Sequence, residues 1–252
     1  MPLTIEVKGS DTLVVAATGY GNKIGRPVNG FFESADLMSA DRIVISDPSK
    51  MLTLSGLPPD FSTFHDLLDH LKSFIHKGKY KRTIFTGASG GAHTALLLGH
   101  LMKADYVVAF APYPYVSRHE LERQNDNSIE SMKRVIDQLS KLSDDVKVYF
   151  DLNHLLQDWN GHTEYWVHVS RYRHCDLRRC RSLEGIDNLT IVTHPFASHA
   201  IAAELANTGR LSECFSFPYS SPAWYRRPIW HALMTMYAVR ISLNQRRARG
   251  RG

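Results

Sequence analysis

The sequence predicts an α/β fold in which helices flank a mainly parallel central sheet. Three observations point to this class. Apolar segments of strand length alternate with segments of helical periodicity over most of the 252 residues. The strand segments are short and almost uniformly apolar, which is typical of strands buried on both faces. One of them runs through a glycine-rich turn straight into a helix.

The first half of the chain contains four predicted strands and two predicted helices. The first strand is expected within 12–22, where it ends in a glycine-rich loop. The other strands are expected at 41–47, 82–87 and 105–112. The helices are expected at 60–78 and 92–104. In the first helix the apolar residues recur at helical spacing, and Gly78 is a plausible end; these residues are Phe64, Leu67, Leu68, Leu71 and Ile75.

The regular alternation breaks after residue 112. We expect 113–163, with a helix at 128–142, to leave the sheet as a short cap insertion. Strand and helix then alternate again, as strands at 165–172 and 188–194 and helices at 176–185 and 199–209. A further helix is predicted within 231–243. The prediction is one domain over residues 1–252 with a cap at 113–163.

Charge and cysteine content exclude several classes of function. The chain has 30 basic and 25 acidic residues, and the five arginines of residues 240–252 account for the excess. We interpret 241–252 as a solvated, flexible basic tail, and we expect no nucleic-acid partner for the neutral remainder. Three cysteines without metal-site spacing suit a reducing compartment. With no secretory signal and no membrane-spanning apolar run, a cytoplasmic location is predicted.

The turn Gly87-Ala88-Ser89-Gly90-Gly91 matches Gly-x-Ser-x-Gly between a predicted strand and a predicted helix. A sharp turn there lifts the serine hydroxyl clear of the sheet and directs the helix N-terminus at it. The alternative is a phosphate-binding loop at the same helix N-terminus. No lysine follows the glycines, and Gly-x-Gly-x-x-Gly is absent, so a nucleophilic serine is favoured.

With this motif and the order of its strands and helices, the sequence resembles the α/β-hydrolase superfamily. The resemblance implies a three-layer sandwich, a triad in the chain order Ser, Asp, His and an oxyanion hole of two main-chain amides. Several short segments, among them "GASGGAHTALLLGHLMKADYVVAFAPY" and "HPFASHAIAAELANTGRL", also resemble small hydrolases found with bacterial polysaccharide assembly proteins. That weaker similarity implies an acylated sugar or another small polar ester as substrate.

The superfamily's architecture narrows the choice of partners for Ser89. The base is expected after the last strand, where His199 is favoured over His194 because it follows a loop that lets the ring reach the serine. The acid is expected after the preceding strand, where Asp176 is favoured. Asp176 could instead cap its helix, and Asp151 and Asp158 are rivals because 146–151 could itself be a strand.

The remaining site predictions concern main-chain amides and the pocket wall. Gly90 should supply one oxyanion-hole amide, and Gly19 or Tyr20, in the loop after an early strand, should supply the other. An ordinary glycine turn is the alternative for that loop. Asp47 and Tyr113 follow carboxyl ends of strands, where open sheets bind ligands, and are predicted to line the pocket.

Together these observations predict a serine esterase that hydrolyses a carboxylic ester through an acyl-enzyme. Its only predicted partner is a small-molecule ester, and neither a metal nor an organic cofactor is expected. Two alternatives remain open. The same serine could transfer the acyl group to an acceptor alcohol, or the fold could serve binding without catalysis.

Overall fold

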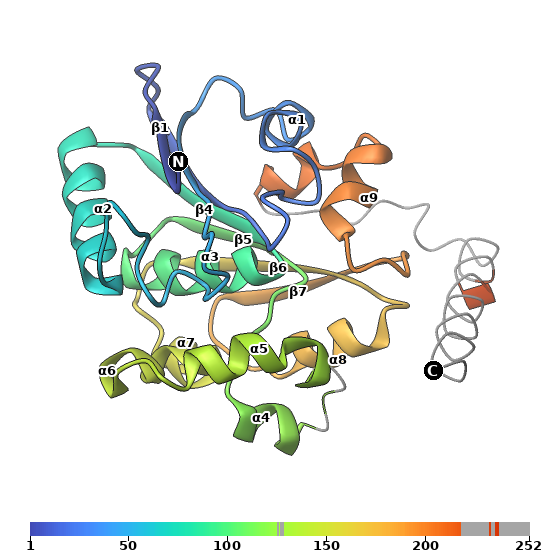
Figure 1. The fold of residues 1–252 in the computed structure, drawn as a ribbon. Coiled ribbons are helices and arrows are strands. Elements are labelled where there is room, and N and C mark those ends of the chain that lie inside the picture. The colour runs from blue at the N-terminus through green and yellow to red at the C-terminus, as the bar shows by residue number, and fades with distance from the viewer. Residues whose placement is uncertain (125, 127–128, 218–231, 233–234, 237–252) are drawn as a thin grey trace.

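A seven-stranded sheet with the order β1-β3-β2-β4-β5-β6-β7 forms the centre of the computed structural model (Figure 1). Residues 1–217 except 125, 127 and 128 are described, together with 232, 235 and 236. Neighbouring strands run parallel except for β1, which pairs antiparallel with β3, so the predicted mainly parallel sheet is confirmed. The strands are β1 Leu3–Glu6, β2 Thr12–Ala17, β3 Asp41–Ile45, β4 Arg82–Ala88, β5 Tyr106–Phe110, β6 Glu164–Ser170 and β7 Leu189–His194.

Helices cover both faces of this sheet. In Figure 1, α1 and α9 lie against one face, and α2 and α3 lie against the other. The described helices are α1 Val28–Ser34, α2 Phe64–Gly78, α3 Gly90–Leu101, α4 Arg118–Arg123, α5 Ile129–Leu139, α6 Asp144–Lys147, α7 Leu152–Gln157, α8 His174–Arg181 and α9 Ile201–Asn207, with 3-10 turns at Val148–Phe150 and Ser212–Phe215. The sequence did not predict α1 or β1.

Two apolar cores result, one on each face. Successive side chains of a strand point to opposite faces, so Val15 of β2 joins the core under α2 and α3 while Val14 joins the core under α1 and α9. Both side chains are almost fully buried. The uniform apolarity of the strand segments is therefore explained by burial on both sides.

Helix α2 shows how local sequence sets an element. Thr63 caps its N-terminus by accepting from the amide of Asp66, whose carboxylate accepts from the amide of Thr63 in return. Leu67 and Leu71 are buried against the sheet. The helix includes Gly78, the predicted end, and it is Lys79 that adopts the left-handed conformation with φ 50°.

Residues 113–163 supply no described strand of the sheet and contain α4 to α7. The alternative strand at 146–151 is wrong, because this stretch folds as the end of α6 and a 3-10 turn. Asp144 and Asp145 lie in the first turn of α6, where negative charge stabilises a helix. Apolar residues of the segment, including Tyr115, Leu121 and Leu152, join the core beneath α3.

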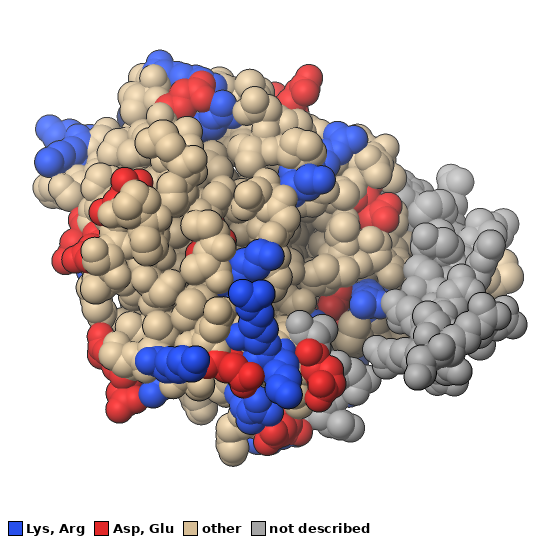
Figure 2. Space-filling model, viewed as in Figure 1, with Lys and Arg blue, Asp and Glu red and all other residues tan. Residues whose placement is uncertain are grey.

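The surface shown in Figure 2 carries both signs of charge. On α4, for example, Arg118 pairs with Asp137 of α5 at 3.0 Å. Among the described helices, none has the length and apolarity to cross a membrane. The basic tail predicted at 241–252 falls outside the described residues. So does the helix predicted within 231–243, of which only residues 232, 235 and 236 are described.

Candidate active site

Ser89 stands at a sharp turn between β4 and α3. Strand β4 ends at Ala88, α3 begins at Gly90, and Ser89 itself has φ 58° and ψ −121°. A positive φ is strained for a residue with a β-carbon, and it persists only where the surroundings enforce it. The amide of Ser89 donates to the carbonyl of Phe110 on the neighbouring strand at 2.9 Å, which anchors the turn to the sheet.

The glycines around Ser89 allow main chain to pack directly on main chain. A β-carbon on Gly91 would lie 2.2 Å from the carbonyl oxygen of Ala17, and one on Gly87 would lie 2.2 Å from that of Gly91. Neither distance is possible for real atoms. Glycine is therefore required at both positions for α3 to approach β2 and β4 this closely.

His199, between β7 and α9, reaches the serine. Its Nε2 lies 2.9 Å from Ser89 Oγ. The alternative, His194, is fully buried, and its Nε2 lies 2.9 Å from Nδ1 of His168. Burial lowers the pKa of His194 to about 3 and so keeps the ring neutral. The structure brings His199, and not His194, to the serine.

Asp176 completes the arrangement from the first turn of α8. Its Oδ2 lies 2.7 Å from Nδ1 of His199. The alternative helix-capping role is wrong, because the N-cap of α8 is Arg173. Asp151 instead caps α7 by accepting from the amide of Asn153 at 3.0 Å.

Two arginines surround the Asp176 carboxylate. Burial disfavours its charged form, but the hydrogen bond from His199 and the positive charges of Arg179 and Arg173 outweigh this, so the pKa of Asp176 lies below its usual value. Arg179 Nη1 lies 3.2 Å from Asp176 Oδ1, and its Nη2 lies 2.6 Å from Oδ1 of Asp126. Asp126, Arg179 and Asp176 therefore form a buried row of charges that ends at His199.

Sequence reasoning missed this row. Arg179 lies three residues after Asp176 on α8, so both face the same side of the helix. That spacing was a usable signal. Asp126 is 53 residues from Arg179 in the chain, and no local pattern connects the two.

The candidate oxyanion-hole amides belong to Gly90, the residue after Ser89, and to the loop of Gly19 and Tyr20. Among the described residues, the amides of Tyr20 and Gly90 have no main-chain partner. The amide of Gly19 donates to the carbonyl of Lys23 at 2.9 Å, so the prediction of Gly19 as a donor is wrong. Gly19 matters sterically instead, because a β-carbon there would lie 3.8 Å from that of Ser89 and 3.0 Å from the carbonyl oxygen of Ala88.

Tyr113 lies beside His199 and Arg179. Its ring centre is 6.1 Å from that of His199, and the guanidinium of Arg179 lies 4.8 Å from it on the ring face. Burial raises the pKa of Tyr113, and the positive charge of Arg179 partly offsets this. The carbonyl of Tyr113 accepts from Nδ1 of buried His93 at 2.7 Å, which ties this residue to α3.

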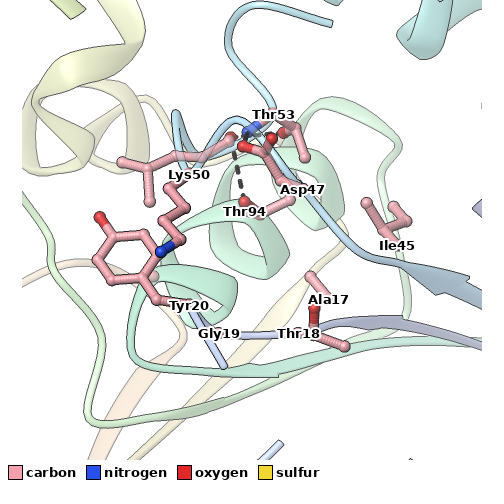
Figure 3. A pocket seen from close by; sticks show the side chains of 11 residues that line it. Ala17, Thr18, Gly19, Tyr20, Ile45, Asp47, Lys50, Thr53 and Thr94 are labelled. Carbon is pink, nitrogen blue, oxygen red and sulfur yellow. Dashed lines mark hydrogen bonds between the residues drawn. The ribbon is translucent and has the colours of Figure 1, made fainter. Parts of the chain in front are cut away.

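A small cavity borders the same region (Figure 3). Its lining includes Tyr20, Gly90, Asp47, Leu52 and Thr94. The carboxylate of Asp47 accepts from the amide of Thr53 at 2.8 Å, so it shapes the wall of the cavity. Figure 3 shows Tyr20 and Lys50 on one side of the space and Asp47, Thr53 and Thr94 on the other.

One group of described side chains has the composition of a metal site. His168, His194 and Cys214 are buried, with their ligand atoms within 4.8 Å of one another. Two nitrogens bound tetrahedrally to one zinc ion at 2.0–2.1 Å would be ~3.3 Å apart. The observed 2.9 Å between the rings is a hydrogen bond, and the nearby charge of Arg210 opposes a cation there.

The arrangement of strands and helices matches that of known hydrolases. An esterase named rPPE, solved as a single-substitution mutant, superposes with a TM-score of 0.56 at 13% identity, covering 83% of this chain and 77% of that one. This chain has the α/β-hydrolase fold. An S-formylglutathione hydrolase from Agrobacterium tumefaciens gives 0.52 at 12% identity, with 82% and 85% covered.

An acyltransferase shares this hydrolase fold. The capsule O-acetyltransferase of Neisseria meningitidis serogroup A, solved as a mutant in complex with CoA, gives a TM-score of 0.56 at 15% identity, with 82% of this chain and 89% of that one covered. No protein-family model matches the chain, and no curated protein sequence does. The superpositions show a shared fold. At sequence identities this low they say nothing about the chemistry, which must be argued from the residues.

Proposed function

We propose that the protein is a serine hydrolase that cleaves a small carboxylic ester through an acyl-enzyme. The observation that carries this proposal is the continuous contact from Ser89 Oγ through His199 to Asp176, at 2.9 Å and 2.7 Å. A serine hydroxyl is a weak nucleophile until a base takes its proton, and a base needs a third group to orient it.

In the proposed reaction Ser89 Oγ attacks the ester carbonyl while His199 Nε2 takes its proton. The negative charge that develops on the carbonyl oxygen is stabilised by the amides of Gly90 and Tyr20. His199 then gives the proton to the departing alcohol oxygen, which leaves the acyl group on Ser89. A water molecule, deprotonated by His199, attacks the acyl-enzyme, and the carboxylic acid is released.

Asp176 acts on this reaction through His199. Its carboxylate accepts the Nδ1–H of the ring, which leaves Nε2 free to act as the base, and its charge stabilises the imidazolium that forms. The low pKa of Asp176 keeps it ionised around neutral pH. We propose a short cap for residues 113–163 and a small polar ester, such as an acylated sugar, as the substrate.

Transfer to an acceptor alcohol is a second candidate function. The likeness to the capsule O-acetyltransferase favours it, because the same acyl-enzyme can be attacked by an alcohol instead of water. Release of acid without an acceptor would identify a hydrolase. Product formation that depends on an added sugar alcohol would identify a transferase.

The test measures hydrolysis of p-nitrophenyl acetate by the parent protein and by Ser89→Ala and His199→Ala. Each substitution should lower kcat/KM by ~10³-fold or more, as loss of a triad member does. Ser140→Ala and His76→Ala change the same residue types at exposed positions and serve as matched controls. A fluorophosphonate probe should label the parent protein stoichiometrically and leave Ser89→Ala unlabelled. Equal rates in parent and Ser89→Ala would refute the proposal.

A further inference from the structure

The two carboxylate oxygens of Asp176 have different partners. Oδ2 lies 2.7 Å from Nδ1 of His199, whereas Oδ1 lies 3.2 Å from Nη1 of Arg179. Asp176 is 2% exposed and Arg179 is 5% exposed, so solvent has little access to either group. Rotation of the carboxylate would break both contacts, and the two partners together therefore fix its orientation.

Asp126 holds the guanidinium of Arg179 in turn. Nε and Nη2 of Arg179 donate to Oδ2 and Oδ1 of Asp126 at 2.5 Å and 2.6 Å, which is a bidentate pair. Because the guanidinium is planar and rigid, this pairing fixes the direction in which Nη1 reaches Asp176. Asp126 belongs to residues 113–163, so a segment that adds no described strand to the sheet contacts the acid behind His199 through one side chain.

Tyr113 covers one face of the same guanidinium. The centre of its ring lies 4.8 Å from the guanidinium carbon of Arg179, within the range of a cation–π contact. The same ring centre lies 6.1 Å from that of His199. Residues 113–163 therefore contact Arg179 from two directions, through an ion pair and through an aromatic ring.

Buried charges of this kind are not explained by stability alone. Taking ions out of water costs free energy, and apolar side chains of similar volume often stabilise such a site equally well. Burial lowers the pKa of Arg179, but the hydrogen bond and the charge of Asp126 raise it, so the guanidinium stays charged. The row ends at the carboxylate that faces His199, which relates it to the proposed reaction.

We propose that Arg179 and Asp126 are positioning residues for the proposed esterase reaction. Asp126 holds Arg179 so that its Nη1 takes Oδ1 of Asp176, which leaves Oδ2 for the Nδ1–H of His199. The positive charge of Arg179 also limits how strongly Asp176 stabilises the imidazolium. The inference rests on the proposed function and assigns part of residues 113–163 to the active site.

Other groups also act on the pair of Asp176 and His199. Titratable and charged side chains face this pair from each neighbouring element, namely Ser89, Tyr113, Arg173, Cys175 and Arg179. Nε of Arg173 lies 3.8 Å from Asp176 Oδ2, but that side chain is 31% exposed, against 6% for Arg179. Solvent screens an exposed charge more than a buried one, so Arg179 should have the larger effect.

The first test is the double variant Asp126→Asn with Arg179→Met, which removes both charges so that neither stays buried without the other. For p-nitrophenyl acetate we expect kcat to fall by about 10- to 100-fold with little change in KM, because Asp176 no longer holds His199 in place. The midpoint of the acid limb of the kcat/KM profile against pH should rise by about 1 unit, since the imidazolium loses a nearby positive charge. Arg181→Met is the matched control, because Arg181 is exposed on α8 and pairs with Glu184.

The second test, Arg179→Lys, separates the charge from the geometry. Lysine keeps the positive charge but lacks the planar fork that contacts Asp126 and Asp176 together. We expect kcat to fall as in the double variant and the acid-limb midpoint to stay at the parent value. A purely structural role would lower the urea midpoint of both variants and leave kcat and the pH profile unchanged.

The outcomes separate this inference from the proposed function. A parent protein that neither reacts with a fluorophosphonate nor hydrolyses the ester would overturn the proposed function. A parent that is labelled at Ser89 and active, with a folded double variant that keeps the parent's kcat or acid-limb midpoint, would overturn the positioning role alone. If the double variant unfolds, Arg179→Lys decides, and an unchanged kcat in that variant overturns the inference.

Discussion

Lowering the pH from 7 to 5 should destabilise the protein through His93. This ring is fully buried on α3, and burial lowers its pKa from 6.5 to about 4. The unfolded chain binds a proton near pH 6.5, whereas the folded protein does so only near pH 4. Stability from the neutral ring is therefore fully present above pH 6.5 and is lost progressively as the pH falls towards 4.

The size of the effect follows from the difference in pKa. Each unit of pKa is worth ~1.4 kcal/mol, so between pH 6.5 and pH 5 His93 alone should lower the unfolding free energy by about 2 kcal/mol. That is a large share of a typical total of ~5–15 kcal/mol. Buried His194, with a pKa of about 3, acts in the same direction.

Urea unfolding at pH 7 and pH 5 measures this effect. In His93→Asn the side-chain amide can still donate to the carbonyl of Tyr113 but does not titrate. The parent should lose about 2 kcal/mol more than this variant between the two pH values, with His76→Asn on α2 as the matched control for the substitution itself. Equal losses in the parent and His93→Asn would refute the reasoning.

Two further predictions concern the strained serine and the buried charges. Ser89→Gly should exceed Ser89→Ala in unfolding free energy by about 1 kcal/mol, because glycine adopts φ 58° without strain; a urea midpoint no higher than that of the alanine variant would contradict this. Asp126→Asn should lower the unfolding free energy by ~3 kcal/mol, since it leaves the buried Arg179 with Asp176 as its remaining carboxylate partner in the row. It should also lower kcat more than it raises KM, because Arg179 then competes with His199 for Asp176, and an unchanged kcat would argue against that coupling.

Local patterns were sufficient where one short stretch determines the structure. The turn at Ser89 could be predicted because its glycines, the preceding strand and the following helix are contiguous. Helix α2 could be predicted because five of its apolar residues recur at helical spacing. The residue types alone did not select His199 and Asp176 as partners of Ser89. That prediction also used the order of strands and helices in a family that the sequence resembles.

Features that depend on the tertiary fold were not predictable. The stretch 146–151 could be a strand by its sequence, but it folds as a helix end and a 3-10 turn whose Val146 and Phe150 pack into the core. Helix α1 contains a glycine and lacks an apolar repeat, so its burial through Phe31 and Phe32 left no periodic signal. Gly19 was misjudged because a glycine's position does not show whether its amide already has a partner.

The contact of α3 with the sheet has a consequence for tolerance to change. At Gly87 and Gly91 the backbone of α3 packs directly on the backbone of β2 and β4, with no side chain between them. The position of Ser89 relative to the sheet is therefore set by the polypeptide backbone. Repacking apolar residues elsewhere in the two cores should therefore alter overall stability while leaving Ser89 in place. Divergent sequences can therefore keep this turn at Ser89 as long as these two glycines remain.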